Sequence, residues 1–201
     1  KTNARSPLLS SLIYYGMGIG FIGFCVLNLG LFATLAKPEF SFEIGLVCLV
    51  FSVLVCAKSI LNGRHISLKT LHISSPKITQ RYNLVFISDI HLGSNPRQHL
   101  EKICTMIKRL DYDYLLIGGD LYDSSSFVPE DLMPLTAIQK PILFVTGNHE
   151  YYVKNHAEKV ANLSNYNIML LDNESAQFDE LNIIGISDNQ APKLQSDIAH
   201  G

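Results

Sequence analysis

Hydrophobic and polar residues are distributed unevenly along this chain of 201 residues. Two long apolar runs, at about residues 8–36 and 44–62, fill the first third, and a short polar turn that begins at Lys37 separates them. Each run approaches or exceeds the roughly 20 apolar residues that cross a bilayer as a helix. We therefore expect residues 1–63 to form a membrane region with two transmembrane helices, and residues 64–201 to form a separate domain.

Two other kinds of segment could also account for the apolar runs. A cleaved signal peptide has an apolar core of only about 7–15 residues, which is shorter than either run. A buried pair of helices in a soluble protein is the second alternative, and the length and low polarity of the runs disfavour it. The transmembrane hairpin is the interpretation that the pattern favours.

Basic residues lie beside the outer ends of both apolar runs. Lys1 and Arg5 precede the first run, whereas the connecting turn carries one Lys and two Glu. Five more basic residues follow the second run: Lys58, Arg64, Lys69, Lys77 and Arg81. Because loops rich in Lys and Arg stay in the cytoplasm, we expect a multi-pass membrane protein whose soluble domain lies on the cytoplasmic face.

After residue 64 the pattern changes to short apolar runs that alternate with amphipathic stretches. The short runs predict strands at residues 84–88, 114–117, 142–145, 168–171 and 181–186, and alternation predicts a further strand at 66–73. The amphipathic stretches predict helices at residues 98–110, near 129–138, and from about residue 150 onward. This order of strands and helices is typical of a layered α/β domain.

Residues of the types that bind metals come immediately after three of the predicted strands. The residues are Asp89 and His91, then Asp120 and Asp123, then Asn148 and His149. In open α/β sheets, ligands bind at the carboxyl ends of the strands, so these side chains predict a single polar site. Oxygen and nitrogen ligands without thiolate suit manganese, iron or zinc. The four cysteines show neither a CxxC motif nor a Cys/His zinc spacing.

Three motifs occur in a fixed order, each at a strand end: Asp89-x-His91, Gly119-Asp120-x-x-Asp123 and Gly147-Asn148-His149-Glu150. In this arrangement the chain resembles the calcineurin-like metallophosphoesterases, and most closely a membrane-associated bacterial branch of that family. The resemblance covers about residues 84–186. It implies an α/β domain that is the N-terminal half of a four-layer αββα sandwich, preceded here by the transmembrane hairpin.

The resemblance also implies roles for the motif residues around two divalent metal ions. Asp89 and His91 would hold the first metal, Asp120 would bridge both, and Asn148 would hold the second. His149 would act on the substrate as the catalytic residue, and Asp123 would support the ligands without binding metal. The implied activity is hydrolysis of a phosphomonoester or phosphodiester by a hydroxide that two metals share.

The chain departs from the family pattern after these motifs. The family takes further ligands from a His at the end of a later strand and from a Gly-His-x-His pair, and neither feature is visible in the sequence. His200 is the only late histidine, and we expect it at the surface because no apolar strand precedes it. We therefore expect a fragment that lacks the C-terminal ligand motifs and is inactive by itself.

Three alternative functions remain open at this point. The hairpin favours a hydrolase of lipid-linked phosphates or pyrophosphates. A nuclease of the same family is disfavoured, because the net charge is −2 and no aromatic–basic stripe is present, so nucleic acid is not expected as a partner. A catalytically inactive membrane scaffold is the third alternative, which the missing ligands favour. The sequence carries no signal for an oligomeric state.

Overall fold

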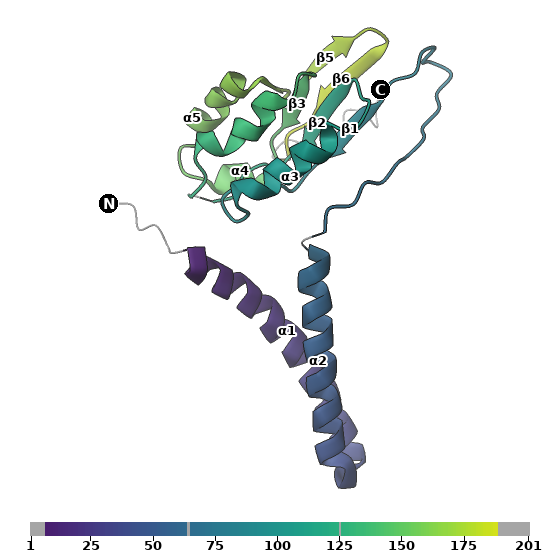
Figure 1. Cartoon of the computed structure of the whole chain (residues 1–201), viewed down its shortest axis with the longest axis vertical. Coiled ribbons are helices and arrows are strands. Elements are labelled where there is room, and N and C mark those ends of the chain that lie inside the picture. The colour runs from purple at the N-terminus through teal and green to yellow at the C-terminus, as the bar shows by residue number, and fades with distance from the viewer. Residues whose placement is uncertain (1–6, 64, 125, 189–201) are drawn as a thin grey trace, which may run out of the picture. The chain divides into compact units, whose positions relative to one another are not determined.

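The computed structural model describes residues 7–63, 65–124 and 126–188, with side chains from Tyr15 onward (Figure 1). The chain divides into two compact units, Lys1–Leu71 and His72–Gly201. The boundary expected from the sequence, between residues 63 and 64, stays a prediction. His200 lies outside the described residues, so its expected surface position also stays a prediction.

The first unit is a pair of apolar helices, α1 (Pro7–Ala36) and α2 (Ser41–Gly63), joined by the 3-10 turn η1 (Pro38–Phe40). Pro38 ends the first helix because its ring cannot continue the helical hydrogen bonds. The helices touch at Gly30, where an added Cβ would lie 2.5 Å from Sγ of Cys48. Both are long and apolar enough to cross a membrane, and most of their described side chains are exposed.

The second unit contains a four-stranded parallel sheet in the order β1-β2-β3-β4 and an antiparallel hairpin of β5 and β6. Along the chain the elements are β1 (Leu84–Ile87), α3 (Arg97–Ile107), β2 (Tyr114–Gly118), η2 (Pro129–Ala137), β3 (Ile142–Val145), α4 (Asn148–Tyr152), α5 (His156–Ala161), η3 (Asn162–Tyr166), β4 (Ile168–Leu170), β5 (Glu174–Phe178) and β6 (Leu181–Gly185). Because the four strands are parallel, all their carboxyl ends meet at one edge of the sheet. The predicted α/β architecture is confirmed.

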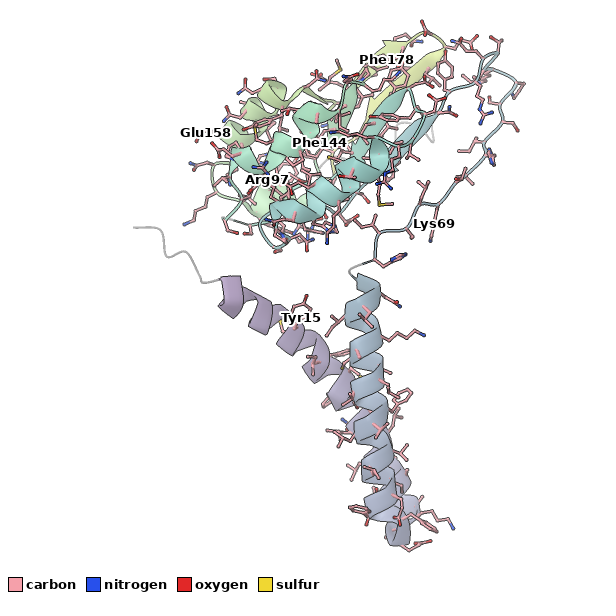
Figure 2. The ribbon with its side chains drawn as sticks, in the orientation of Figure 1. Tyr15, Lys69, Arg97, Phe144, Glu158 and Phe178 are labelled. Carbon is pink, nitrogen blue, oxygen red and sulfur yellow. The ribbon has the colours of Figure 1, made fainter. Side chains whose placement is uncertain are left out.

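One face of the parallel sheet is buried under the helices. Leu115, Ile117 and Phe144 point to this face and are at most 1% exposed, and Figure 2 shows Phe144 in the interior of the domain. The opposite face exposes Leu84 and Phe86, at 45% and 64%. An apolar sheet face needs a covering layer, and a second sheet provides it in an αββα sandwich.

One strand assigned from the sequence needs correction, and one observed strand was not predicted. The strand predicted at 66–73 is wrong: residues 65–75 have no regular structure, and Leu71 and Ile73 are 80% and 84% exposed. Alternation alone does not make a strand when no neighbouring strand pairs with it. Conversely, β5 has the polar sequence Glu-Ser-Ala-Gln-Phe and forms because β6 supplies its hydrogen-bonding partner.

The predicted helices near residues 129 and 150 also differ in detail. The first is the 3-10 segment η2, since the internal Pro134 removes a backbone donor that an α-helix would use. The second begins at Asn148 rather than near residue 150 and is short. Asn155, with a φ of 58°, separates it from α5.

Candidate metal centre

The loops after β1 and β2 run side by side beyond the sheet. The strand pairing ends with Ile87 opposite Ile117, and backbone hydrogen bonds then continue through the loops. The N–H of Asp89 donates to the carbonyl of Gly119 at 3.2 Å, and the N–H of His91 donates to the carbonyl of Asp120 at 2.9 Å. This pairing brings the first two sequence motifs together.

Three of the predicted site residues have an uncommon backbone conformation. Asp89, His91 and Asp120 have φ values of 55°, 52° and 53°, in the left-handed region. A non-glycine residue held in a sparsely populated region costs on the order of 1–3 kcal/mol, and such residues persist where the surrounding structure holds them. They cluster at functional sites, and here they coincide with the motif residues.

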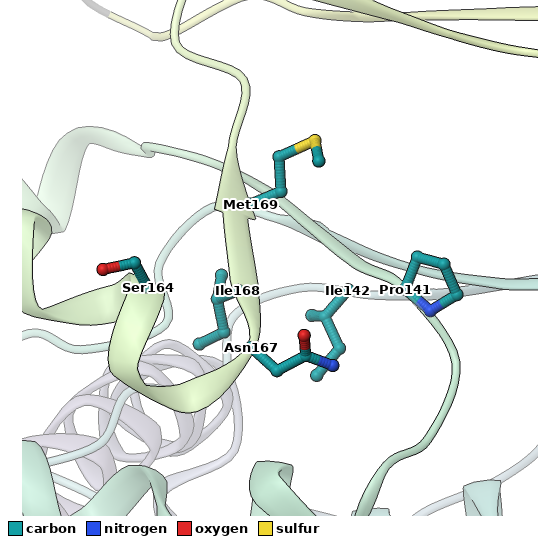
Figure 3. A pocket seen from close by; sticks show the side chains of 6 residues that line it. All are labelled: Pro141, Ile142, Ser164, Asn167, Ile168 and Met169. Carbon is teal, nitrogen blue, oxygen red and sulfur yellow. The ribbon is translucent and has the colours of Figure 1, made fainter.

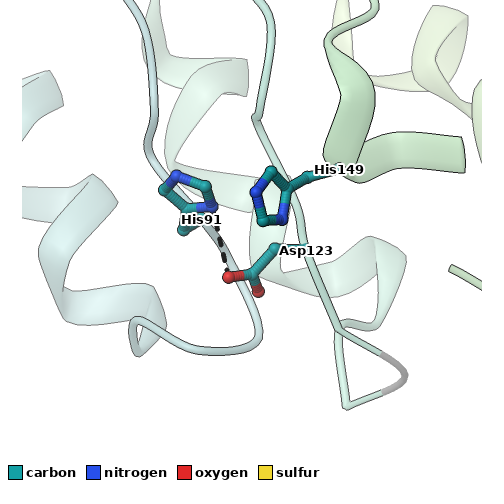
Figure 4. Close-up of side chains that lie close together, drawn as sticks. All are labelled: His91, Asp123 and His149. Atoms are coloured by element: carbon teal, nitrogen blue, oxygen red, sulfur yellow. Dashed lines mark ion pairs between the residues drawn. The ribbon is translucent and has the colours of Figure 1, made fainter. Parts of the chain in front are cut away.

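The side chains of the first two motifs converge with that of His149. Ligand atoms of Asp89, His91 and Asp120 all lie within 4.8 Å of one another, and so do those of His91, Asp123 and His149. Figure 4 shows the second group, in which the rings of His91 and His149 have centroids 4.7 Å apart and are nearly perpendicular. Five of the six predicted residues are therefore brought together.

The charges in this cluster fit a bound cation. Among the described residues, neither Lys nor Arg pairs with the three carboxylates, and His91 is the ionic partner of Asp89 and Asp123. Nδ1 of His91 lies 3.2 Å from Oδ2 of Asp123 but is poorly aligned, so this buried nitrogen makes no hydrogen bond with the described residues. Converging carboxylates repel one another unless a positive charge compensates them. The residues present thus fit a divalent metal.

A glycine lets the loop after β3 approach Asp120. A Cβ on Gly147 would lie 2.2 Å from Oδ1 of Asp120 and 2.8 Å from its backbone nitrogen. The same Oδ1 accepts a hydrogen bond from the N–H of His149 at 3.1 Å. Asn148, between these two residues, is the first residue of α4 and is exposed. The backbone of the third motif therefore packs against Asp120 of the second motif.

Glu150 is a buried carboxylate at this site that the sequence reasoning missed. Its side chain is 0% exposed and accepts hydrogen bonds from the N–H groups of Gly147, Asp120 and Tyr122, at 2.8, 3.1 and 3.1 Å. Burial raises the pKa of the Glu150 carboxyl, and the three hydrogen bonds act in the opposite direction. The spacing of Gly147 and Glu150 fits half of a capping box, which is the signal that could have identified this residue.

An exposed aromatic ring borders the cluster. Tyr152 is 74% exposed, and its ring centroid lies 5.9 Å from that of His149, in an edge-on arrangement. Tyr151 instead lies beside Thr146, with 3.0 Å between their hydroxyl oxygens. Tyr152 is thus the tyrosine of this pair that is available to a ligand.

A hollow of about 310 Å³ lies elsewhere in the domain (Figure 3). Its lining residues are Pro141, Ile142, Ser164, Asn167, Ile168 and Met169. Ile142 and Ile168 begin β3 and β4, so the hollow lies at the amino ends of these strands. No Asp, Glu, His or Cys is among its lining residues, and it is separate from the cluster at the carboxyl ends.

The sequence of this chain is similar to those of known proteins. The family model of the calcineurin-like phosphoesterases matches residues 82–201. An uncharacterised metallophosphoesterase of Helicobacter pylori is 30% identical over 64% of this chain and 36% of its own length, and one of Campylobacter jejuni is 28% identical over 73% and 40%. A bovine transmembrane protein with a metallophosphoesterase domain is 34% identical over 51% and 24%. The chain spans less than half the length of these relatives.

The geometry and the comparisons agree on the same part of the molecule. The matched residues contain the parallel sheet, the three motifs and the cluster of carboxylates and imidazoles at their strand ends. The match covers more than half of the chain, and relatives from bacteria and from a mammal carry the same kind of domain. The chain belongs to the calcineurin-like phosphoesterase family.

Proposed function

We propose that the full-length protein is a membrane-tethered hydrolase of phosphate esters that uses two divalent metal ions. The observation that carries this proposal is the convergence of Asp89, His91 and Asp120, whose ligand atoms lie within 4.8 Å of one another. Metal-dependent hydrolysis is also what membership of the family implies. Manganese is the first candidate metal, with iron and zinc as alternatives, because the ligands are oxygen and nitrogen atoms.

The geometry supports distinct roles for the cluster residues. Nδ1 of His91 faces Asp123, while Nε2 lies 3.7 Å from Oδ1 of Asp89. A carboxylate beside one ring nitrogen commonly orients a histidine so that the other nitrogen binds metal. Asp89 and His91 would therefore hold the first metal, with Asp123 as the supporting carboxylate.

Asp120 and Asn148 are the proposed ligands that extend the site to a second metal. Asp120 lies between the loops after β1 and β3, because its carbonyl accepts from His91 and its Oδ1 accepts from His149. This central position suits a carboxylate that bridges two metals. The remaining ligands would come from a later His and a Gly-His-x-His pair, as the family pattern implies.

Bound metal and the side chains of the protein would contribute different parts of the chemistry. Two bound cations would supply an activated hydroxide and positive charge next to the phosphoryl oxygens. His149 borders the cluster and is proposed to protonate the leaving oxygen of the substrate. Asp123, whose Oδ2 lies 3.2 Å from Nδ1 of His91, is proposed to orient that ring when metal is bound, and the exposed ring of Tyr152 flanks His149.

Hydrolysis is expected to depend on added metal. Purified full-length protein should hydrolyse a chromogenic phosphodiester or phosphomonoester with Mn²⁺, lose this activity after treatment with a chelator, and recover it when Mn²⁺ is restored. Rates before and after chelation measure the effect. Activity that survives exhaustive removal of metal would contradict the mechanism, and no hydrolysis with any metal would favour the inactive scaffold.

A lipid-linked phosphate or pyrophosphate is the second candidate substrate class. The pair of membrane-length apolar helices favours it, since they would hold the protein at a bilayer where such substrates occur. Comparing hydrolysis of a lipid-linked pyrophosphate in vesicles with hydrolysis of a soluble ester distinguishes the two classes. A clear preference for the soluble ester would exclude the lipid-linked class.

The membrane arrangement is proposed from the helices and the basic residues beside them. α1 and α2 have the length and composition of membrane spans, and the bovine relative is named as a transmembrane protein. Basic residues follow α2 along the segment to Arg81, whereas the connection between the helices and the first turn of α2 carry Lys37, Glu39 and Glu43. This bias predicts a cytoplasmic domain.

Reporter fusions test this orientation. Alkaline phosphatase fused after Arg81 should stay inactive in bacterial cells, because that enzyme matures only outside the cytoplasm. A green fluorescent protein fused at the same position should fluoresce. Active phosphatase together with a dark fluorescent fusion would show that the domain faces the other side.

A further inference from the structure

The loops after β1 and β2 are connected differently from the loops after β2 and β3. Among the described residues, backbone hydrogen bonds join the first pair, from Asp89 to Gly119, from His91 to Asp120 and from Leu92 to Leu121. The described part of the chain shows no backbone–backbone bond between residues 119–123 and 147–150. The hydrogen bonds that connect the second pair therefore involve side chains.

The carboxylate of Glu150 makes this connection. Oε2 accepts from the N–H of Asp120 at 3.1 Å and from the N–H of Gly147 at 2.8 Å, so one oxygen joins both loops. Oε1 accepts from the N–H of Tyr122 at 3.1 Å. A second connection, from the N–H of His149 to Oδ1 of Asp120, uses the ligand carboxylate itself.

Helix capping explains only part of this arrangement. A glutamate at this position of a helix needs only the N–H of the residue that precedes the helix, which is Gly147. The bonds to Asp120 and Tyr122 lie outside the helix, and they place a fully buried carboxylate against the loop that carries two motif residues. A buried carboxylate is tolerated only when hydrogen bonds satisfy it, and this one has three.

We propose that Glu150 is a positioning residue, which sets the distance between Asp120 and the loop that carries Asn148 and His149. This inference rests on the proposed metal site. Without the Glu150 carboxylate, the buried N–H of Tyr122 and the part-buried N–H groups of Asp120 and Gly147 would lose this acceptor. Only the bond from the N–H of His149 to Oδ1 of Asp120 would then connect Asp120 to the loop after β3. Because Asp120 is the ligand proposed to bridge the metals, the second metal should bind more weakly.

Glu150→Gln is the sharpest variant, because it preserves the shape of the side chain. The amide keeps one oxygen and replaces the other with an NH₂ group, which cannot accept a hydrogen bond. The apparent Kd for the second Mn²⁺ is expected to rise about 10–100-fold, as for other groups that orient metal ligands. Titration calorimetry of full-length protein gives the Kd, and electron paramagnetic resonance reports whether two Mn²⁺ ions are coupled.

A core variant separates positioning from loss of stability. Leu135 in η2 is fully buried, and Leu135→Ala removes apolar volume without removing a hydrogen bond. It should lower Tm while leaving the Kd for Mn²⁺ and the coupled signal unchanged. A wild-type Kd in Glu150→Gln, or an equal rise in Kd in Leu135→Ala, would overturn the positioning role.

Two further measurements separate a failure of this inference from a failure of the proposed function. If Glu150→Gln does not fold, Glu150→Asp decides, since it keeps the charge on a shorter side chain that cannot reach all three N–H groups. Its Kd for the second Mn²⁺ should also rise, and an unchanged value would overturn the proposal. Wild-type protein that binds no Mn²⁺ would overturn the proposed function, and the role of Glu150 with it.

Discussion

Asp120→Asn should lose bound metal and turnover together, whereas His149→Asn should keep its metal and slow only the chemical step. Asp120 contributes the carboxylate proposed to contact both metals, and an amide has less negative charge to offer. His149 is proposed to face the substrate, so its loss should cost about 10²–10⁴-fold in rate, the usual effect of a missing proton-transfer group. The loss should be smaller for a substrate with a good leaving group.

The structure contains a competing arrangement that this experiment also tests. His149 is within 4.8 Å of ligand atoms of His91 and Asp123, so these three residues form a second possible metal-binding group. Metal content of both variants in the full-length protein, measured together with rates on good and poor leaving groups, distinguishes the two. If His149→Asn loses metal as completely as Asp120→Asn, then His149 is a ligand rather than the catalytic residue.

Gly147→Ala should have the second-largest effect, although it adds a single methyl group. Its Cβ would lie 2.2 Å from Oδ1 of Asp120 and 2.8 Å from the backbone nitrogen of the same residue. Relief of this overlap would have to move the loop backbone or the ligand carboxylate. A displacement of about 1 Å in a catalytic group can cost 10²-fold in rate, and we expect a loss of at least that size.

Gly63→Ala is the matched control for this substitution. It makes the same chemical change at the end of α2, where an added Cβ meets nothing within 4 Å. It should leave both hydrolysis rate and Mn²⁺ content unchanged. Wild-type rate and metal content in Gly147→Ala would show that the approach of the two loops is not needed for activity.

The parallel strands were predictable because they leave a local signal. Each is a short apolar run between polar segments, and β3 was predicted with its observed limits at Ile142 and Val145. The strand predicted at 66–73 had an alternating pattern but no partner, whereas β5 had a polar sequence and a partner in β6. Pairing is a property of two segments, and a single segment does not reveal it.

The amino-acid sequence by itself determined the family, the α/β class, the apolar helices and the motif residues, because these depend on residue type and spacing along the chain. Only the tertiary structure decided how the motifs meet. The left-handed backbone of Asp89, His91 and Asp120 and the closeness of Gly147 to Asp120 depend on loops that are distant in sequence. The same holds for Glu150, which looks like an ordinary acid at a helix start. Its burial and its three hydrogen bonds arise only when β2 and β3 lie side by side, since two of the donors belong to the loop after β2.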